Sequence, residues 1–570
     1  MHNRQFARVG PMRAKVFFYV CAIMAAFLTW RLYKVQVLDG PALAREALEQ
    51  RSDTVEVFAR RGSLEDRDGN VMVRSLPSQS VYLVPHDILD PDGTVAKLET
   101  IFGKLDPAIV TAMRDRSLWF VWLARKVPTD IADRVRSLDL PGVQLKQEDT
   151  GRRIDTIGNT ASTLLGFVGT DENGLDGLEY SLDDYLKGQS GRVTLETDEF
   201  GRPIPFGHET VVTPAKPGLN VELTLDPYLQ FVTEEALNEQ VKKYHALDGT
   251  AIVMDPWTGE ILAMANLPNF DPNRFWKYND ASRRDRAVAD AYEPGSTYKL
   301  LTAAAAIDSG KATLHSSYPA RETIEVGGHV IHNAEDGLPV RGSSETLEQI
   351  IDYSHNVGAA EVALAIGGST FYRMEQRAGF GTDTDVELPG ENPGIVPPPD
   401  QWSDSSLATM AFGQGVSTTP LAMARFYCAI ANGGILLRPR IVREITDAQG
   451  KTIYEYPREI ERRVFSEHTA SELRKVLRSV ITSGTGNPAA QITGYTTAGK
   501  TGTAQRVVNG FYDGSYTSSF IGMIPYQNPR YVILVKIDRP YGAYYGSIVA
   551  APAFDEIARS AMLHAGVLPK

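Results

Sequence analysis

A serine and a lysine three residues apart follow a Pro-Gly break in the stretch 293–299, which reads Glu-Pro-Gly-Ser-Thr-Tyr-Lys. The Ala- and Leu-rich run 300–307 predicts a helix that starts near Ser296. Residues three apart share one helix face, so the amine of Lys299 would lie beside the Ser296 hydroxyl. A serine becomes a good nucleophile when a base takes its proton. Alone, this pattern more often marks a helix cap followed by a solvated lysine.

Two further motifs favour a catalytic serine over a helix cap. Tyr-Ser-His-Asn occupies 353–356, and Gly-Lys-Thr-Gly-Thr-Ala occupies 499–504. Separately, the first could be a turn with local hydrogen bonds and the second a plain strand end. The order Ser-x-x-Lys, Ser-x-Asn, Lys-Thr-Gly, with these gaps, is typical of serine enzymes that penicillin acylates.

The residue types fit acyl transfer through a serine ester. Ser296 would attack an amide or ester carbonyl and form an acyl-enzyme. Lys299 is the expected base, held by Ser354 and Asn356. Ser354 can relay a proton to the leaving amine. Lys500 adds positive potential, which suits a substrate carboxylate and favours a neutral Lys299.

The strand that carries Lys500 would also bind the substrate. Thr501 and Thr503 offer hydroxyl groups to the substrate carboxylate, and Gly502 allows a ligand or backbone to approach closely. The backbone N–H groups of Ser296 and Thr503 would form the oxyanion hole.

Other polar residues give weaker signals. His355 is expected to be exposed or structural, because the Ser-x-Asn motif leaves its middle position open. His329 and His332 could form a metal pair, but the sequence offers no third ligand. Glu387 and Glu391 could act as a deacylating acid, although loop charges explain them better. We therefore expect neither a metal nor a cofactor.

Composition narrows the class of protein. The chain has 570 residues, a net charge of −12 and two cysteines. The negative charge argues against general attraction to nucleic acid. Two cysteines, both in apolar runs, predict neither a disulfide framework nor a cysteine metal site.

The N-terminus predicts a membrane anchor. Residues 1–15 carry four basic residues and no acid, and 16–30 contain no charge. The apolar span reaches 37 if two basic residues snorkel to the interface. A cleaved signal peptide is the alternative, but no clear small-x-small cleavage site follows. We expect a cytoplasmic tail at 1–15, a transmembrane helix at 16–37 and an extracytoplasmic remainder of the chain.

The remainder divides near 205–220, where prolines and glycines cluster. We expect a β-rich, non-catalytic pedestal at 38–220 and an α/β (α+β) catalytic domain at 221–570. Within the pedestal, 164–179 is expected to be irregular, mainly β and extended. The other expected elements are helices at 40–51, 131–138 and 228–243, a hairpin at 60–70, and strands at 221–225, 249–255, 260–265 and around 532–535.

The chain resembles the class B penicillin-binding proteins along most of its length. Beside the three motifs and the anchor, the resemblance is carried by the following segments: Arg-Gly-Ser-Leu-Glu-Asp-Arg-Asp-Gly at 61–69, Gly-Phe-Val-Gly at 166–169, Gly-Leu-Glu at 177–179, Gly-Gln-Gly at 413–415, Ala-Gln at 504–505, Tyr-Gly at 545–546 and Ala-Ala-Pro-Ala-Phe at 550–554. It implies a transpeptidase domain of the penicillin-binding and serine β-lactamase-like fold, an elongated pedestal and a single transmembrane helix. It also implies a D,D-transpeptidase that cross-links peptidoglycan peptide stems and is acylated by β-lactams.

Within that family the chain looks most like the septal, FtsI-type enzymes, with Gln-Trp-Ser-Asp at 401–404 and Leu-Lys-Gly-Gln at 186–189. An elongation-type enzyme of the lateral wall is the alternative, followed by a D,D-carboxypeptidase or β-lactamase and by a non-catalytic sensor. One departure is Arg-Ile-Asp-Thr at 153–156, where the family often has Arg-x-Tyr-Pro. No glycosyltransferase domain is visible, so the resemblance implies a glycan-polymerising partner and divisome proteins.

Overall fold

The computed structural model describes residues 10–148, 150–198, 204, 209–334, 339–340, 342–486, 490–508 and 510–569. They form two compact units, one of residues 1–59 with 189–216 and the other of residues 60–188 with 217–570. Each unit is described by itself.

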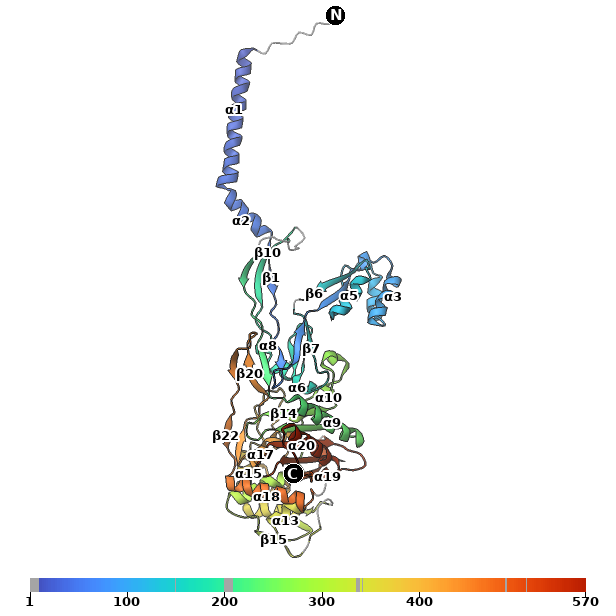
Figure 1. Ribbon diagram of the computed structural model, residues 1–570, viewed down its shortest axis with the longest axis vertical. Helices are drawn as coiled ribbons and strands as arrows, with labels where there is room; N and C mark the ends of the chain where they lie inside the picture. The colour runs from blue at the N-terminus through green and yellow to red at the C-terminus, as the bar shows by residue number, and fades with distance from the viewer. Residues whose placement is uncertain are drawn as a thin grey trace. The chain divides into compact units, whose positions relative to one another are not determined.

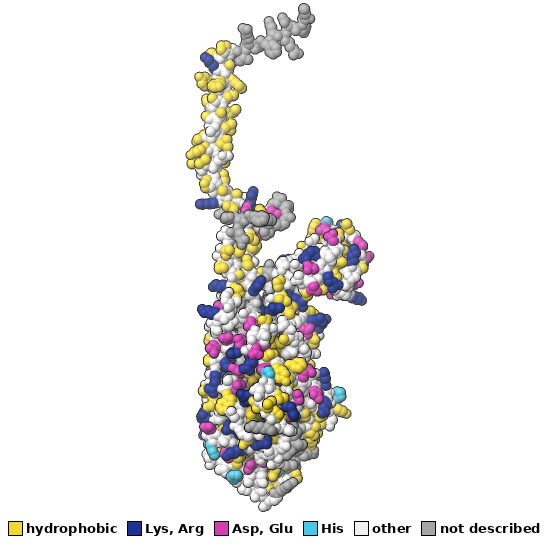
Figure 2. All heavy atoms as spheres, in the orientation of Figure 1, with side chains coloured by type: hydrophobic (Ala, Val, Ile, Leu, Met, Phe, Trp, Pro, Cys, Tyr) yellow, Lys and Arg dark blue, Asp and Glu magenta, His cyan; other side chains and the backbone are white. Residues whose placement is uncertain are grey.

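The first unit contains the apolar N-terminal helix. Helix α1 (Pro11–Tyr33) continues as the π-helical turn η1 (Lys34–Leu38), followed by α2 (Gly40–Gln50). Figure 2 shows hydrophobic side chains all along the first helix, and none of them is buried. By length and composition it is the one helix among the described residues that could cross a membrane. It begins before the expected residue 16 because Pro11 occupies its first turn.

A small antiparallel sheet completes this unit. Its strands are ordered β1-β10-β11 and comprise β1 (Ser52–Val57), β10 (Gly191–Glu196) and β11 (Glu209–Thr213). The chain thus leaves this unit after β1 and returns to it for the other two strands.

One sheet of the second unit has the strand order β5-β4-β6 and is covered by helices. Strands β4 (Gln79–Leu83), β5 (Val121–Val127) and β6 (Val143–Gln147) pack against α3 (Pro91–Phe102), α4 (Pro107–Met113) and α5 (Thr129–Ser137). Leu83, Leu98 and Met113 are fully buried between the layers. The expected helix at 131–138 corresponds to α5.

A six-stranded sheet joins distant parts of the chain. Its order is β21-β20-β12-β2-β3-β7, with β2 (Leu64–Glu65), β3 (Val71–Leu76), β7 (Arg152–Asp155), β12 (Asn220–Leu223), β20 (Val442–Thr446) and β21 (Thr452–Glu455). The expected hairpin at 60–70 is present as β2 and β3, and Asp66 accepts backbone hydrogen bonds across the turn. Strand β12 pairs with both β2 and β20. The sheet therefore contains strands from both sides of residue 220, the expected boundary between the two domains.

The prediction for 164–179 is wrong in part. A hairpin of β8 (Phe167–Val168) and β9 (Gly174–Asp176) lies between two short helices, α6 (Ser162–Leu165) and α7 (Gly177–Ser181). The Asp176 carboxylate accepts a hydrogen bond from the N–H of Gly177 and caps α7. Leu164 and Leu178 are fully buried, and their burial stabilises helical turns too short for a periodic pattern.

A five-stranded sheet has the order β14-β13-β25-β24-β23 and is antiparallel throughout. Its edge strand β14 is labelled in Figure 1. Its strands are β13 (Asp248–Met254), β14 (Ile261–Leu267), β23 (Ala498–Val508), β24 (Phe511–Ile524) and β25 (Tyr531–Asp538). Helices α9 (Pro227–Lys243) and α20 (Ala551–His564) cover one face. Helices α12 (Lys299–Asp308), α17 (Pro420–Ala431) and α18 (Glu467–Thr482) belong to the core on the other.

The remaining elements connect these layers. Helices α13 (Leu347–Tyr353), α14 (Asn356–Ile366), α15 (Gly368–Ala378) and α16 (Ser406–Met410) pack around α12. The shorter ones are η2 (Pro85–Asp87), α8 (Asp183–Leu186), η3 (Pro272–Lys277), α10 (Asp280–Arg283), α11 (Arg286–Ala289), η4 (Gly295–Tyr298), β15 (Ser317–Pro319), β16 (Thr323–Val326), β17 (His329–His332), β18 (Ser344–Thr346), η5 (Pro399–Gln401), β19 (Ile435–Leu437), β22 (Ile460–Arg463) and α19 (Gly546–Val549).

Candidate active site

Ser296 lies on the 3-10 turn η4, which passes directly into α12. The expected α-helical start is therefore a tighter turn. Gly295 has φ +55°, a conformation that favours glycine, and a Cβ there would lie 3.2 Å from the Ala504 side chain. The Thr297 hydroxyl donates to the Pro294 carbonyl at 2.7 Å and fixes the turn. Ser296 remains partly exposed while its neighbours are buried.

Lys299 lies beneath Ser296 as the Ser-x-x-Lys spacing predicts. Its side chain is fully buried. Its Nζ lies 3.0 Å from Ser296 Oγ, 2.8 Å from Asn356 Oδ1, 2.6 Å from the Ser354 carbonyl oxygen and 3.3 Å from Ser354 Oγ. These contacts aim the amine at the serine hydroxyl.

The Ser-x-Asn motif occupies the junction of two helices. Ser354 ends α13 in the left-handed region at φ +62°, and Asn356 is the first residue of α14. His355 between them is fully buried and its Nδ1 contacts the Glu345 carboxylate. The alternative that His355 is exposed is wrong, because this ion-pair geometry holds the ring inside the protein.

The Lys-Thr-Gly motif lies on β23 and contacts the same group. Lys500 is fully buried, and its Nζ lies 2.9 Å from Ser354 Oγ. Thr501 Oγ1 lies 3.4 Å from Thr485 Oγ1. A Cβ on Gly502 would lie 2.4 Å from Ser519 Oγ, so only glycine fits without a shift. Thr503 is partly exposed, and its Oγ1 accepts from the N–H of Gly546 at 3.3 Å.

A buried carboxyl group that the sequence did not indicate, that of Asp352, lies two residues before Ser354 on α13. Asp352 Oδ2 accepts a 2.6 Å hydrogen bond from Ser479 Oγ. Burial raises the pKa of Asp352 to about 7, while the charge of Lys500 opposes that rise. Neither Asp352 nor Glu345 belongs to a motif, so no sequence signal distinguished them from helix and strand surface residues.

The side chains of the other candidate residues lie outside this cluster, although the His332 carbonyl accepts a 3.2 Å hydrogen bond from Asn356 Nδ2. His329 and His332 are exposed on β17, and the described residues contain no group of three potential metal ligands. Glu387 accepts a hydrogen bond from the N–H of Ile441, and Glu391 accepts one from Thr384. Both carboxylates therefore bind backbone N–H groups of neighbouring segments.

Comparison with known protein families gives two matches. Residues 249–559 match the penicillin binding protein transpeptidase domain, and residues 56–223 match the penicillin-binding protein dimerisation domain.

Similar proteins cover nearly the full chain. Peptidoglycan D,D-transpeptidase FtsI of Escherichia coli is 32% identical over 94% of this chain and 89% of its own length. Stage V sporulation protein D of Bacillus subtilis is 33% identical over 96% of this chain and 85% of its own. Penicillin binding protein 3 of Mycobacterium tuberculosis, solved in complex with ampicillin, superposes with a TM-score of 0.70 at 30% identity and covers 90% of this chain and 97% of its own.

The matched domains, these relatives and the shared penicillin-binding fold agree with the resemblance in the motifs. The chain therefore belongs to the class B penicillin-binding proteins, the family of peptidoglycan D,D-transpeptidases.

Proposed function

We propose that Ser296 is the nucleophile that takes over the acyl group of one peptide stem and passes it to the amine of another. The observation that carries the proposal is the convergence of Lys299, Ser354, Asn356 and Lys500 on one hydrogen-bonded cluster beside Ser296 Oγ.

In the first step, Ser296 Oγ attacks the carbonyl carbon of the terminal amide bond and gives its proton to neutral Lys299. The tetrahedral intermediate then expels the terminal amino acid as an amine. The proton returns through the Ser354 hydroxyl, which lies between the two lysines, to that leaving nitrogen. In the second step the acceptor amine attacks the ester carbon, and Lys299 takes one of its protons and returns it to Ser296 Oγ, which leaves as the free hydroxyl.

Binding groups surround this path. Thr501 and Thr503 would hold the substrate carboxylate near Lys500. Gly502 keeps β23 close to the serine turn, since a side chain there would meet Ser519 and Thr297. The N–H groups of Ser296 and Thr503 would bind the oxyanion.

The proposal is tested by labelling the full-length protein in detergent with fluorescent penicillin and mapping the modified peptide. We expect one adduct on Ser296 that persists for many minutes, and none in Ser296→Ala. Stoichiometric labelling of Ser296→Ala would overturn the assignment. Release of hydrolysed penicillin within seconds would favour a β-lactamase, and a free tetrapeptide without cross-linked product would favour a carboxypeptidase.

We also propose a septal role in cell division, since FtsI is among the relatives that cover most of the chain. The N-terminal helix would anchor the chain in the inner membrane with residues 1–15 in the cytoplasm, followed by the pedestal to 220 and the transpeptidase domain from 221. A glycan-polymerising glycosyltransferase and divisome proteins would be its partners. Mid-cell localisation of a fluorescent fusion supports this role. An even distribution along the lateral wall would indicate an elongation enzyme.

A further inference from the structure

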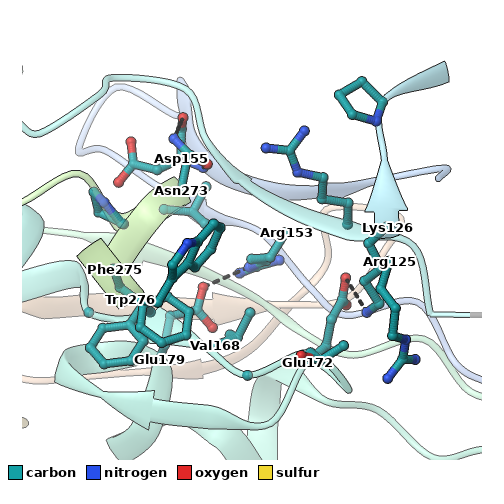
Figure 3. Close-up of a pocket in the computed structure, with 18 of the residues that line it drawn as sticks. Arg125, Lys126, Arg153, Asp155, Val168, Glu172, Glu179, Asn273, Phe275 and Trp276 are labelled. Atoms are coloured by element: carbon teal, nitrogen blue, oxygen red, sulfur yellow. Dashed lines mark hydrogen bonds and ion pairs between the residues drawn. The ribbon is translucent and has the colours of Figure 1, made fainter. Parts of the chain in front are cut away.

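A cavity of about 360 Å³ lies in the second unit, and no residue of the three motifs lines it. Four segments form its walls (Figure 3): the end of β5 at 125–128, strand β7, the hairpin region 166–172 and the turn η3. A volume of this size falls in the range of small-ligand pockets.

One wall is aromatic. The rings of Phe167 and Phe275 stack with centroids 4.2 Å apart, and Trp276 stands edge-on to Phe275. Trp276 lines the cavity and is 66% exposed. In Figure 3 the Phe275 and Trp276 rings lie together at one end of the cavity and Arg125 and Lys126 at the other.

A residue of the cavity wall also has a buried hydrogen-bond donor that the protein leaves unused. Arg153 donates through Nε to Glu179 at 2.7 Å and through Nη1 to the Gly62 carbonyl at 2.6 Å. Its Nη2 is buried and has no hydrogen-bond partner. Arg152 and Lys126 line the same cavity, and burial lowers the pKa of both, so their charges are only partly solvated.

Two other residues that line the cavity have unused acceptors. Asp155 Oδ1 accepts from the N–H of Ile157, whereas its buried Oδ2 has no partner. Glu172 Oε2 accepts from Ser75, whereas its Oε1 has no hydrogen bond and lies 4.0 Å from Lys126 Nζ. Lys126 and Glu172 both have positive φ, at 50° and 61°. Non-glycine residues in this strained region cluster at ligand sites.

We propose that this cavity binds a short peptide with a free carboxylate and an apolar part, the chemistry of a peptidoglycan stem. The peptide carboxylate accepts from Arg153, Arg152 and Lys126, its N–H groups donate to Asp155 and Glu172, and its apolar part packs on Phe275 and Trp276. A simple anion would leave the carboxyl groups unmatched, and an apolar ligand would leave the cations unmatched. The site rests on the proposed function only in the identity of its ligand, and it gives the chain a second contact with its substrate.

The test uses the full-length protein in detergent, first acylated with penicillin so that the Ser296 site is blocked. Muropeptides released from purified peptidoglycan by a muramidase are titrated in by calorimetry. Parallel titrations use the same muropeptides with their carboxylates converted to methylamides, and the disaccharide without peptide. We expect binding by the first probe, at least tenfold weaker binding by the second, and none by the third.

Two variants address the cavity itself. Trp276→Ala removes the exposed ring, and Asp155→Asn keeps the Oδ1 acceptor while turning the unused acceptor into a donor. Each should weaken muropeptide binding at least tenfold, while the matched control Trp119→Ala, which removes a 64% exposed ring elsewhere, leaves it unchanged. Binding that is absent in the acylated protein, equal in these variants, or reproduced by the disaccharide would overturn the proposal. Penicillin labelling, measured on the same samples, separately reports failure of the Ser296 assignment.

Discussion

The Nζ of Lys500 lies 2.9 Å from the hydroxyl oxygen of Ser354. The same oxygen lies 3.3 Å from Lys299 Nζ, so one hydroxyl contacts both buried lysine amines of the site. The proposed mechanism uses this hydroxyl to carry the proton that Lys299 takes from Ser296 to the leaving nitrogen.

Removing this hydroxyl should slow acylation without unfolding the protein. We expect Ser354→Ala to reduce the rate constant for penicillin acylation by about 10²–10⁴-fold, the usual contribution of a positioned proton-transfer group. Stopped-flow measurements with a fluorescent penicillin report this rate. Ser403→Ala, on an exposed loop, is the matched control. A Ser354→Ala rate within threefold of the control would exclude the relay.

The close approach of β23 to the serine turn makes a second prediction. In Gly502→Ala the new Cβ would lie 2.4 Å from Ser519 Oγ on β24 and 3.1 Å from Thr297 Cγ2 on the serine turn, so the Ser519 side chain must move and the turn must shift slightly away from β23. We expect at least a tenfold loss of acylation rate and a destabilisation of about 1–3 kcal/mol, typical of overpacking.

Gly169→Ala serves as the comparison, since its nearest neighbour would be at an ordinary 3.4 Å. Thermal unfolding and acylation rates are measured for both variants. Equal rates in the two would mean that the spacing between β23 and the serine turn does not limit acylation.

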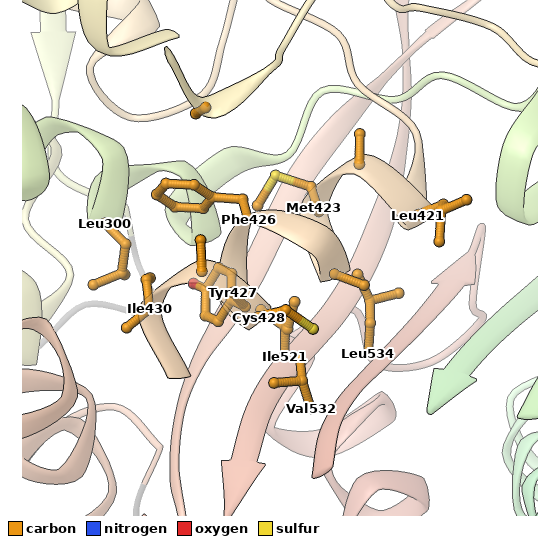
Figure 4. Close-up of a cluster of buried hydrophobic side chains, with 14 of the residues drawn as sticks. Leu300, Leu421, Met423, Phe426, Tyr427, Cys428, Ile430, Ile521, Val532 and Leu534 are labelled. Carbon is orange, nitrogen blue, oxygen red and sulfur yellow. The ribbon is translucent and has the colours of Figure 1, made fainter. Parts of the chain in front are cut away.

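Periodic segments were predictable from the sequence, and local turns were not. The expected helix at 228–243 and strands at 249–255 and 260–265 are present as α9, β13 and β14. A helix buried on one side repeats its apolar residues, and a strand buried on both faces is a short apolar run, so both can be recognised in the sequence. The apolar pattern around Cys428 is the helix α17, every residue of which is buried. Figure 4 shows this helix packed against Ile521 of β24 and against Val532 and Leu534 of β25, in the five-stranded sheet.

The site was predictable to the extent that its residues belong to spaced motifs. The contact of Glu345 with His355 had no such signal, because it joins a strand to a helix junction through side chains whose types fit many surfaces. The 3-10 geometry at Ser296 was likewise invisible, since it depends on packing of Gly295 against β23. The departure at 153–156 was visible, but only the fold places Arg153 and Asp155 on one cavity wall.

The segment that matches the dimerisation domain contains a buried ion-pair cluster that should matter for stability alone. Arg61 is 2% exposed in its side chain and contacts Glu179 at 2.6 Å and Asp183 at 2.6 Å. Arg61→Ala would leave Glu179 with fewer partners in a desolvated position. Breaking a buried pair in this way costs about 3–5 kcal/mol.

The matched control is Arg136→Ala, whose partner Asp133 is exposed, and such surface pairs contribute about 0–1 kcal/mol. Urea unfolding followed by circular dichroism compares the two variants. We expect Arg61→Ala protein that remains folded at low temperature to label with penicillin as the wild type does. Equal midpoints for the two variants would show that the buried cluster does not stabilise the chain.

A buried glutamate beneath the serine turn should make stability depend on pH. Glu375 is fully buried and accepts a hydrogen bond from the Tyr298 hydroxyl at 2.9 Å, and burial raises its pKa to about 8 from an ordinary 4.5. The folded chain therefore keeps this proton up to about pH 8, whereas the unfolded chain loses it near 4.5. Because the folded state binds the extra proton, this group's contribution to stability falls as pH rises between these values, by on the order of 5 kcal/mol in full. Glu375→Gln keeps an acceptor for Tyr298 and cannot ionise, so its unfolding free energy should decline less than that of the wild type between pH 5 and pH 8. Urea titrations of both proteins at the two pH values measure the difference, and parallel declines would mean that Glu375 does not titrate in this range.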